Sequence, residues 1–250
     1  MKTLSRLLLL KSFVSMTLIT HGQFVEKTDM SFRNARFDIL VIKIDSLLAD
    51  RISFAENIGM AVESKYLDSI GQITNSSFFA ITASVVDSAC NPLGLFVSEG
   101  REYKNINLAK GAGNFFIRPN GIFAITRERD FFISDASKFD TTKNLTIAIQ
   151  SGPMLLSNGM INPNFDRNSK NKHIRCSVGL YVDKGTQFLV FVKSADPISF
   201  FQMAQLLQEK FNCQDALNLE SGSNCSMHPI VMPGNYDDQK MICRYLLVFF

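Results

Sequence analysis

Residues 150–182 read QSGPMLLSNGMINPNFDRNSKNKHIRCSVGLYV, and this stretch organises the chain around it. Gln150 to Pro153 is a polar turn that closes an apolar run of β type, Leu145 to Ile149. Asn158-Gly159 then separates two short apolar runs. Because both residues tolerate positive φ, Asn-Gly in this setting predicts a β-hairpin.

The second half of the stretch is polar and then apolar again. A polar loop runs from Asn162 to Lys172, and Arg175 stands just before the apolar run from Val178 to Val182. A turn, a hairpin, a polar loop and one arginine close together favour the rim of a pocket over a packed core. The alternative is a solvent-exposed arginine that follows a basic loop.

Segments with strand character lie on both sides of this stretch. Residues Arg36 to Asp45 read RFDILVIKID, with apolar side chains at alternate positions on both faces, which predicts a strand whose middle is buried on both sides. A turn at Pro119-Asn120-Gly121 predicts a hairpin that joins Phe116-Ile117 to the following apolar run. Further strands are expected at 131–134, 186–193, 215–219 and 244–250.

One segment late in the chain has helical spacing. Between Ser199 and Phe211 the apolar positions are 200, 203, 204, 207 and 211, which lie on one face of a helix. Ser199 or Asp196 can cap its N-terminus, and Pro197 lies near the first turn. Many short strands, one clear helix and no alternation of the two predict an α+β fold: a single domain with mixed or antiparallel sheets and a few helices.

Composition agrees with a globular domain. The chain has 250 residues, of which 46% are hydrophobic and 20% charged, so it can bury a substantial core. The net charge is +3 and no basic block occurs, so we expect no nucleic-acid partner.

The first 22 residues have the character of an export signal. Lys2 and Arg6 precede the apolar runs Leu7 to Leu10 and Phe13 to Ile19. We therefore expect a signal peptide over residues 1–22 and an exported domain, periplasmic or secreted, over residues 23–250. No apolar run reaches the ~20 residues of a membrane span, so none is expected in the mature chain. The alternative is an amphipathic N-terminal helix of a cytosolic protein.

The cysteines suggest an oxidised protein without a metal cluster. There are five, at positions 90, 176, 213, 225 and 243, so at least one is free or intermolecular. No pair has C-x-x-C spacing, which gives no support to a metal site. Cys213 and Cys225 flank one short predicted strand, and we expect them to form a disulfide. The sequence leaves the question of a cofactor open.

Several motifs together resemble the phosphodiester glycosidase family, which includes the enzyme that uncovers mannose 6-phosphate. They are Q-S-G-P-x-L from Gln150, R-x-x-V-G from Arg175, and G-x-G-N-F-F followed by P-N-G-x-F between Gly111 and Phe123. The resemblance runs from about Asn75 to His228. It implies a hydrolase that cleaves a sugar joined through its anomeric carbon to a phosphodiester, with a sugar phosphate or glycan as substrate.

The resemblance also implies roles for particular residues. Glu220 occupies the position of the family's aspartate in L-D-G, which makes it the candidate acid, base or nucleophile. Arg175 is the candidate phosphate ligand, because a guanidinium pairs with two phosphate oxygens at once. The candidate substrate contacts are Asn75, Asn114, Gln150, Ser151, Ser223 and His228.

Departures from the family pattern keep a second hypothesis open. The family's two glycines after Asn75 are Ser76 and Ser77 here, Glu220 replaces an aspartate, and Ser221 replaces a glycine. Such changes could alter the site or disable it. The alternative is a catalytically inactive member of the fold that binds a cell-surface glycan, in which Glu220 is a surface loop carboxylate.

Export makes a direct prediction about the mature protein. Mass spectrometry of the protein purified from its native cell should show a chain that starts near Gln23. An intact Met1 on that protein would contradict export.

Overall fold

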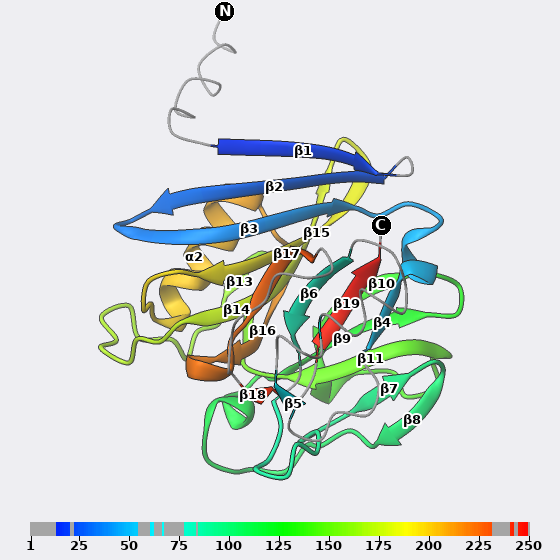
Figure 1. The fold of residues 1–250 in the computed structure, drawn as a ribbon. Helices are drawn as coiled ribbons and strands as arrows, with labels where there is room; N and C mark the ends of the chain where they lie inside the picture. Colours follow the sequence, from blue (N-terminus) through cyan, green and yellow to red (C-terminus); the bar gives the residue numbers. More distant parts are fainter. Residues whose placement is uncertain are drawn as a thin grey trace, which may run out of the picture.

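A computed structural model describes residues 14–20, 23–54, 61–62, 67, 78–83, 85–231, 241–242 and 245–249. An antiparallel sheet of eight strands spans the molecule, in the order β1-β2-β3-β15-β14-β16-β12-β13 (Figure 1). Its strands are β1 (Val14–Thr20), β2 (Gln23–Phe32), β3 (Ala35–Lys43), β12 (Met154–Ser157), β13 (Met160–Ile161), β14 (Arg175–Asp183), β15 (Thr186–Ser194) and β16 (Asp215–Ser221).

Smaller sheets cover one face of this large sheet. A five-stranded sheet has the order β10-β9-β11-β7-β8, and a four-stranded sheet has the order β17-β6-β19-β4. The first contains β7 (Phe96–Ser98), β8 (Arg101–Lys104), β9 (Gly121–Thr126), β10 (Phe131–Asp135) and β11 (Leu145–Ser151). The second contains β4 (Ile52–Phe54), β6 (Phe78–Thr82), β17 (Met227–Val231) and β19 (Tyr245–Phe249). The short strands β5 (Ala61–Val62) and β18 (Met241–Ile242) pair with each other.

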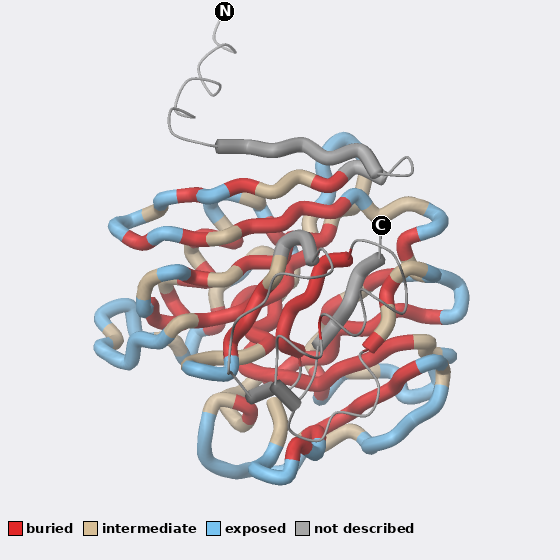
Figure 2. The backbone as a smooth tube through the Cα atoms, viewed as in Figure 1, coloured by how far each residue is buried: buried red, intermediate tan, exposed pale blue. Residues whose placement is uncertain are grey.

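The main hydrophobic core lies between the large sheet and the smaller sheets, and the strands that border it are buried over most of their length (Figure 2). The side chains of β3 are buried on both faces of the large sheet. Leu40 and Ile42 point into this core, whereas Phe37, Ile39 and Val41 belong to a second core on the other face. The prediction of a strand buried on both sides is confirmed, and so is the α+β fold built from antiparallel sheets.

The second core is closed by α2 (Phe200–Phe211), which lies behind the large sheet in Figure 1. Its apolar face shares this core with residues of β3, β12, β15 and β16. Ser199 caps the helix in a capping box: its side chain accepts from the Gln202 N–H, and the Gln202 side chain accepts from the Ser199 N–H. The helix was predicted from the sequence, and of the two caps that the sequence offered, Ser199 and Asp196, the structure has Ser199.

The two predicted turns have different outcomes. Asn158 and Gly159, with φ of 50° and 73°, join β12 to β13 as the Asn-Gly hairpin predicted. The hairpin at residues 119–121 is wrong, because Phe116 ends a short 3-10 helix, η2 (Asn114–Phe116), instead of a strand. The Asn120 side chain donates to the Phe115 carbonyl at 3.1 Å, so the motif ties this helical turn to the start of β9.

The predicted disulfide between Cys213 and Cys225 is also wrong. Cys225 is bonded to Cys176, with the two Cα atoms 5.6 Å apart, and Cys213 is free. Cys176 and Cys225 both lie in the main core, whereas Cys213 lies in the second core on the other side of the large sheet. Cys90 is disulfide-bonded as well. Burial raises the pKa of the Cys213 thiol well above its usual range.

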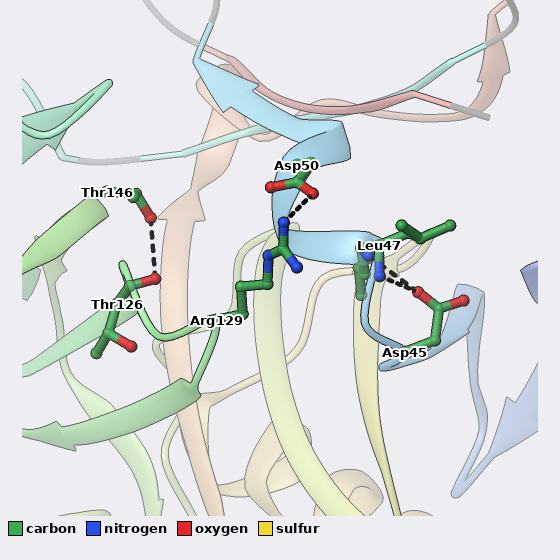
Figure 3. A network of polar contacts seen from close by, with 7 residues as sticks. Asp45, Leu47, Asp50, Thr126, Arg129 and Thr146 are labelled. Carbon is green, nitrogen blue, oxygen red and sulfur yellow. Dashed lines mark hydrogen bonds and ion pairs between the residues drawn. The ribbon is translucent and has the colours of Figure 1, made fainter.

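A polar contact between sheets follows the end of β3, as Figure 3 shows. Asp45 accepts hydrogen bonds from the N–H groups of Leu47 and Leu48, both at 2.9 Å, just before the short 3-10 helix η1 (Leu48–Arg51). Asp50 in that helix pairs with Arg129 at the β9–β10 turn, with 2.7 Å between nitrogen and oxygen. Both side chains are half exposed, so this ion pair contributes little to stability.

The outer edge of the five-stranded sheet differs from its interior. β8 pairs with β7 on one side and is exposed along its whole length, with the sequence Arg-Glu-Tyr-Lys. In the described residues, no helix is long and apolar enough to cross a lipid bilayer.

Gln150 fixes a loop onto the end of β11. It has no exposed surface, and its Oε1 accepts from the N–H groups of Leu95 at 3.0 Å and Asn107 at 2.8 Å. Its Nε2 donates to the Asn107 carbonyl at 2.7 Å. Gly94 lets the amide approach this closely, since a Cβ there would collide with Gln150 Oε1. These contacts occupy the amide with the protein's own backbone.

Replacing Gln150 with methionine, which has a similar shape, should therefore destabilise the protein. The change leaves the N–H groups of Leu95, which is buried, and of Asn107, which is half-buried, without this acceptor, and it should lower the free energy of unfolding by about 2–5 kcal/mol. Denaturant titration measures this loss. Gln214→Met is the matched control, because Gln214 is exposed and should change stability by less than about 0.5 kcal/mol. Equal stability of the two variants would contradict the structural role of Gln150.

Candidate functional site

The candidate site forms where β14 and β16 pair at one end of the large sheet. Arg175 is opposite Ser221, Cys176 is opposite Glu220, and the register then shifts so that Ser177 is opposite Asn218. The residue between, Leu219, is the extra residue of a β-bulge. Bulges redirect the side chains that follow them and are common beside active sites.

The Arg175 side chain is fully buried and contacts several segments of the protein. It has no exposed surface, and its guanidinium carbon lies 3.5 Å from the centroid of the Phe200 ring. Nε donates to the Ile198 carbonyl at 2.9 Å, Nη1 to the Ser221 hydroxyl at 2.9 Å, and Nη2 to the Asn171 carbonyl at 3.3 Å. The hypothesis of a solvent-exposed arginine is therefore wrong.

Among the described residues, no acidic side chain balances the charge of this guanidinium. Within the described residues no carboxylate forms an ion pair with Arg175, and burial lowers the pKa of Arg175 to about 10. The group is still protonated at neutral pH. Three of its five N–H groups have acceptors in the described residues, which leaves one N–H on each terminal nitrogen. A buried cation with two such donors is a candidate for binding an anion.

Ser221 connects Arg175 to a chain of buried polar groups. Its hydroxyl donates to Asn218 Oδ1 at 3.3 Å, and Asn218 Nδ2 donates to the Gly152 carbonyl at 3.0 Å. The Asn218 N–H donates to the Pro153 carbonyl at 3.1 Å. Asn218 thus joins β16 to the Ser-Gly-Pro turn that follows β11.

Ser151 also joins this turn to β16. It has no exposed surface, and its hydroxyl donates to the Leu219 carbonyl at 3.0 Å, at the bulge itself. A side chain at Gly152 would be too close to the Phe115 carbonyl, at 2.8 Å from an added Cβ. The Ser-Gly-Pro turn therefore packs against both the bulge and the 3-10 helix.

Glu220 lies at the other face of the same strand end. Neighbouring positions in a ladder project to opposite faces, so Glu220 shares the face of Cys176 while Ser221 shares that of Arg175. The Glu220 carboxylate is half-buried and accepts from the Ser221 N–H at 2.8 Å, which turns it back toward the strand end. Ser221 is the residue that joins the predicted carboxylate to the predicted arginine.

The other predicted contacts are spread more widely. Gln150 and Ser151 are buried in backbone contacts, and Asn114 is partly exposed in η2. Ser223 is exposed in the 3-10 helix η4 (Gly222–Asn224), three residues after Glu220. His228 is half-buried on β17, where Nε2 lies 3.2 Å from the Ser226 hydroxyl. Asn75 lies outside the described residues.

Sequence reasoning missed Asn218 and Ser221. Asn218 is 1% exposed within a strand of otherwise apolar residues, Ala216 to Leu219. A polar side chain that interrupts an apolar strand must find a partner, and this signal was present in the sequence. Ser221 could not be placed beside Arg175 without knowing the register of β14 and β16.

The described residues offer no evident metal site. They contain no group of three or more His, Cys, Asp or Glu side chains placed to hold a metal ion. The donors around Arg175 are carbonyl, hydroxyl and amide groups together with a cation, a set that suits an anion better than a metal.

Comparison with known proteins identifies a relative by sequence and two solved structures of similar fold. Over 154 residues the chain is 34% identical to the uncharacterized protein YigE of Escherichia coli K12. That match covers 62% of this chain and 58% of YigE, which is less than two thirds of the relative's length.

Two solved structures share the fold. The catalytic domain of zebrafish N-acetylglucosamine-1-phosphodiester alpha-N-acetylglucosaminidase, auto-inhibited by its pro-peptide, superposes with a TM-score of 0.56. It is 15% identical, and the match covers 95% of this chain and 82% of that chain. A hypothetical protein from Synechocystis has a TM-score of 0.57 at 15% identity, covering 94% and 63%. At this identity the likeness concerns the fold.

The family model of the phosphodiester glycosidases matches residues 70–245 of the chain. This range is more than half of the chain and includes β14, β16, the Ser-Gly-Pro turn and Glu220. The chain therefore belongs to the phosphodiester glycosidase family.

Proposed function

We propose that this chain hydrolyses a glycan in which a sugar is joined through its anomeric carbon to a phosphodiester. Family membership supports a glycosidase acting on a glycan phosphate. The observation that carries the proposal is Arg175, a buried cation with no acid partner in the described residues and with one N–H to spare on each terminal nitrogen. Those two donors match the paired oxygens of a phosphate.

In the proposed reaction, water adds to the anomeric carbon while the bond from that carbon to the phosphodiester oxygen breaks. The products are the free sugar and a phosphomonoester. Glu220 is the proposed catalytic carboxylate. Because its side chain leaves the strand on the face opposite to Arg175, one substrate would have to meet both residues at the end of β14 and β16. Glu220 either transfers a proton to or from the reacting oxygens or attacks the anomeric carbon, which are the two roles of carboxylates in glycoside cleavage.

Arg175 is the proposed phosphate ligand. Because it has no exposed surface, a phosphate reaches the guanidinium only if part of its cover moves, and Asn171 in the exposed loop before β14 is part of that cover. Binding the anion would then supply the charge that the protein does not. Asn75, Asn114, Gln150, Ser151, Ser223 and His228 remain predicted substrate contacts, with Gln150 and Ser151 acting through the backbone that they hold.

We further propose that the protein acts outside the cytoplasm, in the periplasm or as a secreted protein. The N-terminal charge and apolar runs support this, and the bond between Cys176 and Cys225 is compatible with an oxidising compartment. Cleavage near Gln23 would remove β1, so the large sheet of the mature protein would begin at β2.

A non-catalytic glycan-binding protein is the second candidate. Two observations favour it: Glu220 and Ser221 replace the family's Asp-Gly, and Arg175 is covered in this arrangement. The hydrolase should turn over a sugar-1-phosphodiester, whereas the non-catalytic glycan-binding protein should not.

Glu220→Gln should abolish that turnover while the fold is retained. Glutamine keeps an acceptor oxygen for the Ser221 N–H but cannot exchange a proton or attack carbon, so kcat should fall at least about a hundredfold. Kinetics on N-acetylglucosamine 1-phosphodiesters and a thermal melt measure the two effects. Glu128→Gln, at an exposed position on the β9–β10 turn, is the control for the loss of one carboxylate. Unchanged turnover in Glu220→Gln would exclude Glu220 from the chemistry.

Arg175→Lys should weaken phosphodiester binding or turnover at least about tenfold. Lysine keeps a charge but loses the planar fork, and a hydrogen bond to a charged group contributes about 1.5–3 kcal/mol. Arg129→Lys, in a half-exposed ion pair, should have almost no effect.

Ser221→Ala shows whether Arg175 acts directly. It removes the hydroxyl contact of Nη1 and leaves the guanidinium in place. If Arg175 binds the phosphate, Arg175→Lys should raise KM more than Ser221→Ala does. Equal losses in kcat with unchanged KM would instead mark Arg175 as a positioning residue. Wild-type kinetics in a folded Arg175→Lys protein would remove it from the site.

A further inference from the structure

A basic groove lies beside the N-terminal turns of α2. It has a volume of about 690 Å³. Its lining carries four cationic side chains and no acidic one among the described residues: Arg33, Arg167, Lys170 and Lys172, together with Asn34, Asn168, Ser169, Ser199, Phe201, Gln202 and Gln205. All four cations are exposed, in a protein whose net charge is only +3.

The cations of the groove are largely unneutralised. Arg33 pairs with Glu209 at 2.7 Å, and the Arg167 guanidinium lies 5.3 Å from the centroid of the Phe201 ring. Within the described residues, neither Lys170 nor Lys172 has an ion-pair partner. A concave surface lined by charges of one sign concentrates the field and attracts an anion of opposite sign.

The groove and the candidate site are built from the same two segments. Lys170 and Lys172 flank Asn171, whose carbonyl accepts from Arg175 Nη2. Ser199 and Phe201 alternate with Ile198 and Phe200, which contact the same guanidinium. One side of each segment therefore faces the groove while the other encloses Arg175.

We infer that this groove binds the continuation of the substrate, and that the substrate is a glycan polymer with several phosphodiester groups. This inference rests on the proposed function and names the substrate class of that site. With one phosphodiester at Arg175, further phosphates along the polymer would lie against Lys170, Lys172 and Arg167. The side-chain amides of the lining are suited to hydroxyl groups. The same loop that covers Arg175 would thus be contacted by the polymer.

Binding of poly(glycerol phosphate) tests the inference without hydrolysis. This polymer carries repeated phosphodiesters but has no glycosidic bond, so the wild-type protein cannot turn it over by the proposed reaction. Calorimetry should show binding that weakens as salt increases, whereas neutral dextran of similar length should not bind.

The groove lysines should carry this affinity. In Lys170→Ala/Lys172→Ala the affinity should fall at least about tenfold, because each lysine near a polyanion contributes on the order of a fivefold factor. Lys138→Ala/Lys184→Ala is the matched control: it removes the same charge at two exposed positions outside the groove lining and should leave the affinity unchanged.

Three results would overturn the inference: no binding by the wild type, equal losses in both double variants, or tighter binding of a single-stranded oligonucleotide of equal charge. The last would assign the groove to nucleic acid. Because the probe is not hydrolysed, each of these is distinguishable from a failure of the proposed function, which is tested by Glu220→Gln on a small substrate.

Discussion

The buried charge of Arg175 constrains everything around it. Removing a guanidinium from water is costly unless its donors find acceptors, and here those acceptors come from three separate segments: the loop before β14, the segment before α2 and the end of β16. Each must be held in place for the charge to be tolerated. The bulge at Leu219 presents Ser221, the capping box fixes the start of α2, and Asn218 ties the bulge to the Ser-Gly-Pro turn.

Local features of the fold were predictable from sequence, because local chemistry determines them. Asn158-Gly159 forms its hairpin since both residues adopt positive φ, and Ser199 caps α2 since Gln202 lies three residues later. The double-sided pattern of β3 follows from its apolar residues alone. The segment before Pro119 was misassigned, because a side-chain contact from Asn120 to a backbone carbonyl stabilises a 3-10 turn there.

Long-range features were less accessible. Cys213 and Cys225 are close in sequence, but they lie in different cores on the two sides of the large sheet, whereas Cys176 and Cys225, 49 residues apart in sequence, lie in the same core. Arg175 was singled out from its motif, yet its burial depends on segments that are far apart along the chain. Gln150 was predicted to face a substrate, and its amide in fact satisfies the backbone of a loop more than 40 residues away in sequence.

The form of β8 bears on how the protein behaves at high concentration. An edge strand offers unpaired backbone groups to any other strand, and a flat apolar edge is a starting point for aggregation. β8 is four residues long, exposed throughout, and carries Arg101, Glu102 and Lys104. A second molecule that added a strand here would have to bring its own backbone beside these charges and desolvate them. The five-stranded sheet is therefore protected against growth from this edge, which favours separate molecules over fibrils.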